Sequence, residues 1–259
     1  MSKLSEKQLN DFIDQGYLRL DGVFDQQTAE EARKILWEAM GVQEATGVYW
    51  KEPVIYLGDF AQKPFREAAN SERLAVAFDQ LVGQQNWIPR MSLGSFPIRF
   101  PSLKEPGDTG WHVDASFPGD EPGDYMKWRI NICSKNRGLL MLFLFSDVTT
   151  ADAPTRIRVG SHLDVARILK PFGKEGLSFT ELADKLGSTS NRKEIFATGE
   201  AGTVYLCHPF LVHAAQKHLG QNPKFMAQPP LFTKNDLSPL VEKEEYPAVE
   251  MAIRKALKV

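Results

Sequence analysis

The stretch GTVYLCHPFLVHAA, residues 202–215, decides the fold of this chain. Two runs of apolar, β-branched and aromatic residues, 203–207 and 210–214, flank a His-Pro dipeptide. This composition predicts two short strands with a break between them, because proline cannot donate a hydrogen bond inside a sheet. The stretch also places His208 and His213 in an apolar context, where a buried imidazole needs a polar partner.

Similar runs occur along the middle of the chain, between Asn86 and Phe232. Pro, Gly, Asp and Ser, which favour turns, separate them. The further predicted strands are 128–133 (WRINIC), 139–145 (LLMLFLF) and 155–159 (TRIRV). Many short strands joined by polar turns are typical of a sandwich or barrel, so a mainly β fold with flanking helices is expected.

Helical patterns lie on both sides of this β region, and Tyr17–Leu20 is a brief predicted strand before it. Read from capping residues and apolar spacing, the predicted helices cover 5–16, 25–41, 70–83, an insert near 162–186 and a segment from about 247. Because no linker is evident, residues 1–259 are expected to form a single domain. Its predicted parts are a helical N-terminal part at 1–85, a β core at 86–235 and a C-terminal helix within 236–259.

Length and composition argue against several classes of protein. The 259 residues include 31 basic and 33 acidic side chains, mixed along the chain, so no nucleic-acid surface is expected. Cys133 and Cys207 are too few for a disulfide framework, which favours a reducing cytoplasm. The longest apolar run, Leu139–Phe145, is far shorter than a membrane span, and the N-terminal residues lack the apolar core of a signal peptide. Neither membrane insertion nor export is expected.

The sequence Trp111-His112-Val113-Asp114 is the sharpest candidate for chemistry. Residues two apart on a strand share a face, so this pair would direct an imidazole and a carboxylate to one point. A His-x-Asp pair alone is a weak signal, and most lone histidines on apolar faces are core residues bonded to the backbone. With a histidine from 202–215, however, the pair completes the two-histidine, one-carboxylate set that leaves one face of Fe(II) open.

Four segments resemble the phytanoyl-CoA dioxygenase family of Fe(II)/2-oxoglutarate oxygenases. They are LSEKQLNDFIDQGYLRLDGVF (4–24), HVD (112–114), DAPTRIRVGSH (152–162) and HPFLVHAA (208–215). The resemblance implies a double-stranded β-helix, a cupin-like jelly roll of two sheets with the metal inside one open end. It further implies that His112, Asp114 and His213 bind Fe(II), with 2-oxoglutarate as cosubstrate and with dioxygen and a small organic molecule as the other partners.

The resemblance also separates the ligand histidine from the others. It puts His213 in the ligand position, and on an uninterrupted strand His208, five residues earlier, would point to the opposite face. His208 is therefore interpreted as a structural residue or as one that supports a ligand. His162 and His218 are weaker ligand candidates, and His162 stands at a predicted helix start, where capping and packing explain it.

At the cosubstrate position the chain departs from the family pattern. The family usually has arginine eleven positions after the distal histidine and a hydroxyl residue two positions after it, where this chain has Lys224 and Ala215. Lysine is a point charge rather than a rigid bidentate fork, so it would orient a carboxylate less strictly, and an ordinary surface lysine is the alternative. The expected cosubstrate contacts are Lys224, Arg129 and Trp128, with Arg156 and Arg158 as further candidate sources of positive charge.

Clues to the substrate and the reaction are fewer. The candidate aromatic walls of a pocket, each equally well explained as core, are Tyr49, Trp50, Trp111, Phe117 and Trp128. The turn-rich segment Phe117–Asp124 follows the metal pair and is expected to be either a mobile lid or a plain surface loop. Asp114 favours hydroxylation over halogenation, because Gly or Ala there would open a position for halide. Two alternatives stay open: a non-oxidative enzyme with another divalent metal on the same triad, and a degenerate barrel that only binds a small molecule.

Overall fold

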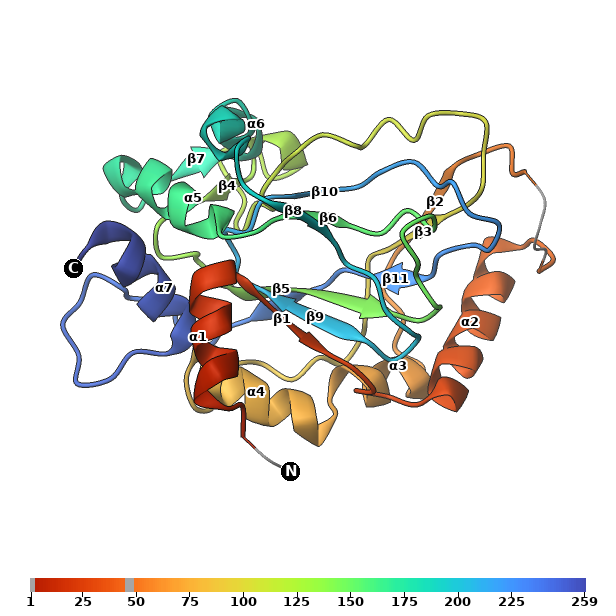
Figure 1. Ribbon diagram of the computed structural model, residues 1–259, viewed down its shortest axis with the longest axis horizontal. Coiled ribbons are helices and arrows are strands. Elements are labelled where there is room, and N and C mark those ends of the chain that lie inside the picture. The colour runs from red at the N-terminus through yellow and green to blue at the C-terminus, as the bar shows by residue number, and fades with distance from the viewer. Residues whose placement is uncertain (1–2, 45–48) are drawn as a thin grey trace.

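The computed structural model describes residues 3–44 and 49–259, and two antiparallel sheets form its core, with helices packed around them (Figure 1). The larger sheet has five strands in the order β1, β9, β5, β11, and β12 also pairs with β5. Their bounds are β1 Tyr17–Leu20, β5 Arg137–Leu144, β9 Val204–Cys207, β11 Met226–Ala227 and β12 Pro230–Phe232. The prediction of a mainly β core with flanking helices is confirmed.

Strand β5 is buried along its whole length, and its two faces pack against different partners. Met141 and Phe143 belong to the large apolar cluster formed with the helices. Leu140 and Leu142 belong to a smaller cluster that includes Ile157 of the second sheet. A strand covered on both faces needs no polar side, which explains why this part of the chain reads as a continuous apolar run.

The smaller sheet has three strands in the order β10, β6, β8. They are β6 Arg156–Arg158, β8 Glu194–Phe196 and β10 His213–Ala214, and His213 pairs with Ile157. Two further pairs join β2 (Val54–Leu57) to β3 (Phe96–Arg99) and β4 (Arg129–Ile130) to β7 (Leu177–Ser178).

The predicted helices form where capping residues and apolar spacing place them. They are α1 (Glu6–Gln15), α2 (Gln26–Met40), α4 (Glu72–Val82) and α7 (Ala248–Leu257). Ser5 and Gln8 make the reciprocal capping box at the start of α1, and Gly16 ends that helix in the left-handed conformation. Figure 1 shows α1 and α4 on the side of the large sheet that faces away from β6, β8 and β10.

The N-terminal part is less purely helical than predicted. Strand β1 is a full member of the large sheet, where it pairs with β9, and β2 pairs with β3 of the core. Helix α3 (Lys63–Ala69) was not predicted, because it is only two turns long and the side chain of its N-cap residue, Gln62, makes no capping hydrogen bond. Residues 3–44 and 49–85 thus complete the sheets as well as cover them.

Two predicted strands are much shorter in the structure. The run 128–133 keeps only β4, because the Asn131 side chain accepts hydrogen bonds from the backbone N–H groups of Cys133 and Lys135 and closes a turn. The run 210–214 keeps only β10, because Phe210 N–H donates to His208 Nδ1 and Val212 N–H donates to Ser161 Oγ. In both places side chains take the hydrogen bonds that a ladder would have made.

The predicted insert near 162–186 is confirmed as helical but is interrupted by β7. It consists of α5 (Ser161–Leu169), η2 (Lys170–Phe172), α6 (Phe179–Ala183) and η3 (Leu186–Thr189). A further short helix, η1 (Tyr125–Lys127), precedes β4 and contacts α6. Within the described ranges, no helix combines the length and the apolar character needed to cross a membrane.

Candidate metal centre and its cavity

A direct backbone pairing brings His112 and His213 together. Each donates its N–H to the carbonyl of the other, both at 3.0 Å, and the ring centroids are 4.4 Å apart. Side chains of residues paired in this way lie on the same face. Asp114 Oδ1 is 3.7 Å from His112 Nε2 and 3.8 Å from His213 Nε2. One donor atom from each residue lies within 4.8 Å of the other two, so the three predicted ligands converge on one point.

Backbone carbonyls orient both imidazoles. His112 Nδ1 donates to the carbonyl of Gly110 at 2.8 Å, and His213 Nδ1 donates to that of Leu211 at 3.0 Å. A proton held on Nδ1 leaves the lone pair on Nε2, the atom that faces Asp114. Burial, followed by the neighbouring His112, lowers the pKa of His213 to about 4. The His213 ring is therefore neutral near pH 7, which is the form that binds a metal.

Arg137, the first residue of β5, holds the carboxylate of the third ligand. Its Nη1 donates to Asp114 Oδ2 at 2.8 Å, and both side chains are largely buried. Burial raises the pKa of Asp114, but Arg137 and the two histidines outweigh it and hold that pKa well below the usual range. Oδ2 is thus engaged and Oδ1 is left for a metal. Arg137 was not predicted as a site residue, although a charged residue at the start of an apolar strand was an available signal.

The triad lies in the wall of a cavity of about 790 Å³, a size typical of small-molecule sites. Pro97 of β3, Tyr125 and Met126 of η1, and Phe179 of α6 give the cavity much of its apolar lining. Besides the histidines, the charged residues among the described lining are Arg99, Asp108, Asp114 and Arg137.

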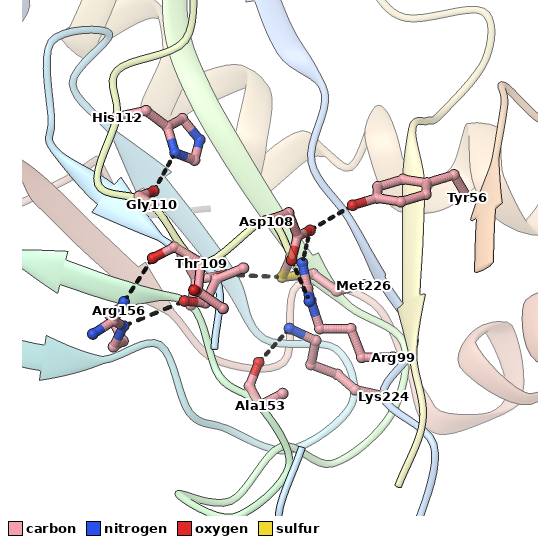
Figure 2. A network of polar contacts seen from close by, with 12 residues as sticks. Tyr56, Arg99, Asp108, Thr109, Gly110, His112, Ala153, Arg156, Lys224 and Met226 are labelled. Atoms are coloured by element: carbon pink, nitrogen blue, oxygen red, sulfur yellow. Dashed lines mark hydrogen bonds and ion pairs between the residues drawn. The ribbon is translucent and has the colours of Figure 1, made fainter. Parts of the chain in front are cut away.

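Lys224 is the cross-strand neighbour of Arg99 (Figure 2); Arg99 lines this cavity, and Lys224 itself is not among the lining residues. Their backbones exchange two hydrogen bonds, so their side chains lie on the same side. Lys224 is 1% exposed, and its Nζ donates to the carbonyl of Ala153 at 2.5 Å. Burial and then Arg99 lower the pKa of Lys224 well below its usual value. Lys224 is therefore a buried lysine whose charged form is disfavoured while it lacks a carboxylate partner, and the surface-lysine alternative is wrong.

Arg99 in turn pairs with Asp108, which precedes the metal pair. Its Nη1 donates to Asp108 Oδ1 at 3.1 Å and its Nη2 to Oδ2, while the Tyr56 hydroxyl also donates to Oδ2 (Figure 2). Burial, with the Asp108 contact as the next cause, raises the pKa of Tyr56 to about 12. Arg99 and Asp108 could not be predicted from the sequence, because their role depends on the pairing of β3 with the chain at Lys224.

Arg129 and Trp128 do not reach the cavity. Arg129 Nε and Nη2 each donate at 2.9 Å to backbone carbonyls, those of Glu175 and Gly176. Trp128 Nε1 donates to the carbonyl of Pro122 at 2.8 Å. Neither side chain lines the cavity, so the structure does not bring these two predicted cosubstrate contacts to the triad. The guanidinium is instead committed to the helical insert.

Arg156 and Arg158 do not line the cavity either, and both guanidinium groups contact the Trp111 ring. Their Cζ atoms are 4.6 and 4.1 Å from the centre of the Trp111 ring, a cation–π arrangement that fixes the indole. Arg156 Nη2 donates to the carbonyl of Thr109 at 2.9 Å, and its Nε donates to that of Ala215 at 3.3 Å.

Trp111 alone among the proposed aromatic walls lines the cavity. Tyr49 is 74% exposed, Trp50 packs in the core 4.4 Å from the ring of Phe100, and Phe117 lies under the ammonium of Lys135. The aromatic side chains that do face the cavity, Tyr56, Tyr125 and Phe179, were missed because they come from short elements with no aromatic periodicity.

The segment Phe117–Asp124 runs beside the cavity without lining it. Phe117 and Arg129 exchange backbone hydrogen bonds at 3.1 and 2.8 Å, and Asp124 caps η1 by accepting from Met126 N–H. A mobile lid stays a prediction. The next residues, Tyr125 and Met126, are the ones that line the cavity.

The other histidines lie outside the triad. His162 and His208 stack with ring centroids 4.8 Å apart, and their Nε2 atoms donate to the carbonyls of Ile13 and Val249. His218 Nε2 donates to the carbonyl of Asn222. Each has the backbone partner that a buried structural histidine requires.

Several solved structures share this fold. The non-heme α-ketoglutarate-dependent carbocyclase SnoK from nogalamycin biosynthesis aligns with a TM-score of 0.59 at 16% identity, over 90% of this chain and 85% of its own. HygX from Streptomyces hygroscopicus with nickel and 2-oxoglutarate bound aligns with a TM-score of 0.57 at 17% identity, over 89% and 88%. The epimerase SnoN, in complex with Fe3+, α-ketoglutarate and nogalamycin RO, gives 0.58 at 19%, over 88% and 82%. At these identities the likeness establishes the fold.

A comparison with sequence families agrees with the site. None of the curated proteins compared with the chain matches it. The family model described as phytanoyl-CoA dioxygenase matches residues 12–226, a span that contains the metal triad, Arg99, Arg137 and Lys224. This span covers well over half of the sequence, and the chain therefore belongs to the phytanoyl-CoA dioxygenase family.

Proposed function

We propose that this protein is an Fe(II)- and 2-oxoglutarate-dependent dioxygenase that hydroxylates an unactivated C–H bond of a small organic molecule, on a double-stranded β-helix. The observation that carries the proposal is the convergence of His112, Asp114 and His213 in the wall of a cavity. Two imidazoles and one carboxylate occupy one face of an octahedral ion and leave the other face for small ligands. Membership of the family supports the same assignment.

The three side chains fit Fe(II) in protonation as well as in position. The carbonyls of Gly110 and Leu211 hold the Nδ1 protons and direct both Nε2 atoms inward, while Asp114 is ionised. Other divalent metals bind the same donors, since ligand type does not select one metal, and HygX was crystallised with nickel. A redox-silent metal can therefore replace iron in binding experiments.

Lys224 and Arg99 fit the far carboxylate of 2-oxoglutarate. They are two adjacent buried basic residues, and among the described residues only Asp108 forms an ion pair with either of them. Burial disfavours the charged form of Lys224 as long as it has no partner, so an incoming carboxylate would stabilise the protonated amine and be stabilised by it. When bound, iron and 2-oxoglutarate would supply the oxidative chemistry: 2-oxoglutarate and dioxygen would be converted to succinate and carbon dioxide, and one oxygen atom would go to the substrate. The chain itself orients the substrate beside the triad and keeps water out.

Hydroxylation is the outcome we favour over others that this fold hosts. SnoK is described as a carbocyclase and SnoN as an epimerase, so similar scaffolds serve different reactions. Asp114 is present where Gly or Ala would open a position for halide, which argues against halogenation. A product heavier than the substrate by one oxygen atom would identify hydroxylation.

An anaerobic titration tests the proposal. Fe(II) followed by 2-oxoglutarate should produce a weak visible charge-transfer band in the wild-type protein and none in His213→Ala. His218→Ala, which removes a buried histidine outside the cavity, serves as the matched control and should keep the band. Oxygen uptake coupled to succinate formation then separates an oxygenase from a hydrolase or isomerase. Iron bound at the triad with neither a band nor succinate formation would contradict the proposal.

A further inference from the structure

We infer that the substrate of this cavity is an uncharged molecule with a flat ring system, aromatic or fused, and with neutral hydroxyl or carbonyl groups. The inference rests on the proposed function, because it concerns the space beside the metal triad. Two observations carry it: the charged side chains of the cavity are paired with one another, and aromatic rings extend outward from the triad.

The described lining residues include two guanidinium groups and two carboxylates, and they form two closed pairs. Arg99 binds Asp108, and Arg137 binds Asp114. Asp108 also accepts the Tyr56 hydroxyl, and the free oxygen of Asp114 faces the histidines. A charged substrate would have to separate one of these pairs and leave a largely buried charge alone, which is strongly unfavourable.

Charged substrate classes therefore fit the cavity poorly. A polycation such as an aminoglycoside needs free carboxylates, and a phosphate-bearing molecule such as a coenzyme A thioester needs free cations. Lys224 is not among the lining residues, and under the proposed function it serves the carboxylate of 2-oxoglutarate rather than the substrate. The family is named for a coenzyme A thioester, yet this cavity offers no unpaired cation among its described lining residues for the phosphates.

The aromatic rings form a series of contacts that starts at His112 of the candidate metal triad. Phe179 lies 5.5 Å from the ring of His112, Tyr125 lies 5.6 Å from Phe179, and Trp128 continues outward 5.6 Å from Tyr125. Phe179 and Tyr125 line the cavity, as does Trp111, whose ring is held by two guanidinium groups. Because Phe179, Tyr125 and Trp111 line the cavity, their rings can make offset or edge contacts with a flat ring bound there.

Neutral polar groups remain to orient the substrate. Ser95 and Gln228 line the cavity, and neither side chain has a hydrogen-bond partner among the described residues. A hydroxyl and an amide can both donate and accept, so they suit a hydroxyl or carbonyl group of the substrate. Together with the rings, they define a molecule that is mostly apolar and has few polar groups.

Calorimetric titration of the protein loaded with Mn(II) and 2-oxoglutarate tests this inference without turnover. The probes are flavanone, testosterone and 2-naphthol as neutral ring compounds, spermine as a polycation and octanoyl-CoA as a polyanion. We expect at least one neutral ring probe to bind at least about tenfold more tightly than either charged probe. Tighter binding of spermine or octanoyl-CoA, or no binding of any neutral ring probe, would overturn the inference.

Variants of Phe179 test whether the ring itself is recognised. Phe179→Ala should weaken binding of the neutral probe about tenfold, and Phe179→Leu, which keeps apolar volume without a ring, should restore only part of it. Phe172→Ala is the matched control, because Phe172 lies on the surface of the same insert outside the cavity. Equal affinities in all three variants would contradict a ring site.

Repeating the titration without 2-oxoglutarate separates this inference from the proposed function. If the protein binds a neutral ring compound tightly but does not bind 2-oxoglutarate, the inferred substrate class stands and the dioxygenase assignment is wrong. If the protein binds 2-oxoglutarate but prefers a charged probe, the inferred substrate class is wrong and the dioxygenase assignment stands.

Discussion

At the scale of single residues, the candidate metal ligands are held in place by neighbouring groups. The carbonyls of Gly110 and Leu211 orient the two imidazoles, and Arg137 holds the Asp114 carboxylate through Oδ2, which leaves Oδ1 facing the histidines. We interpret Arg137 as a positioning residue, because its guanidinium binds Asp114 and would not itself coordinate a metal. Such supporting contacts commonly account for a large part of metal affinity.

Arg137→Met should weaken metal binding about 10- to 100-fold, because Asp114 would lose the partner that orients it and keeps it ionised. Arg137→Lys should restore part of the affinity by keeping the charge. Arg129→Met, in which the lost guanidinium binds only the insert, should leave metal affinity unchanged. Calorimetric titration with Mn(II) measures all three, and wild-type affinity in Arg137→Met would refute the role of Arg137.

Lys224→Met should lower the affinity for 2-oxoglutarate by about tenfold or more while leaving the free energy of unfolding equal or higher. Burial disfavours the charged form of Lys224, so an apolar side chain of similar length costs the fold little, whereas the carboxylate of the cosubstrate loses a charge-assisted contact. Calorimetry and urea unfolding of the metal-loaded protein provide the two readouts.

Arg129→Met again serves as the control for this prediction, because sequence reasoning had placed Arg129 in the cosubstrate site. If Arg129→Met reduces 2-oxoglutarate affinity and Lys224→Met does not, the assignment of the two cations has to be reversed.

At the scale of elements, the turn between α1 and β1 is where the N-terminal part joins the insert. Gly16 has φ +84°, and a Cβ added there would lie 2.4 Å from His162 Nδ1 of α5 and 2.8 Å from the side chain of Leu211. Glycine is required twice over, for its left-handed conformation and for the close approach of α5. This contact packs α1 against the segment that leads to β10, which carries His213.

Gly16→Ala should lower the free energy of unfolding by about 2 kcal/mol more than Gly22→Ala does, because overpacking adds to the backbone strain. Gly22 has φ +61° and open space around its Cα, so its substitution reports the strain alone. Urea unfolding of both variants makes the comparison. Similar losses in the two would show that α5 moves aside without cost.

At the scale of the whole molecule, two buried histidines join elements from both ends of the chain. His162 of α5 bonds to the end of α1, and His208 bonds to Val249 of α7. Burial lowers the pKa of His162 to about 4, and burial followed by His162 lowers that of His208 well below its usual value. Asp14, Asp164 and Arg192 are the other charged groups that act on His162, with smaller effects than burial.

The free energy of unfolding should therefore fall as the pH drops from about 6.5 to about 4, since the unfolded chain takes up protons that the folded chain refuses. His162 alone accounts for up to about 3 kcal/mol of this loss, and the loss ends below its folded pKa. His162→Gln should flatten the pH dependence, measured by urea unfolding of the metal-free protein. Parallel pH profiles for the variant and the wild type would contradict this explanation.

Much of the architecture could be predicted because its signals are local. The capping box at Ser5, the left-handed Gly16 and the apolar run of β5 each depend on neighbours within a few residues, and each prediction is confirmed. Strand lengths at 128–133 and 210–214 were overestimated, because the Asn131 side chain and the Ser161 hydroxyl replace the ladder hydrogen bonds. Strand propensity does not reveal such competition from side chains. At Val212 the competing hydroxyl, that of Ser161, also lies far away in the sequence.

The family, most of the helices and the candidate metal triad could be predicted from the chain alone, because alternation along a strand and motif spacing are properties of short segments. Which basic residues line the cavity could be seen only in the folded protein, where Arg99 and Arg137 line it and Arg129 does not. The physical reason is that these roles come from pairings between distant segments, His112 with His213 and Arg99 with Lys224. Register between strands sets the direction of each side chain, and the packing of the whole chain sets the register.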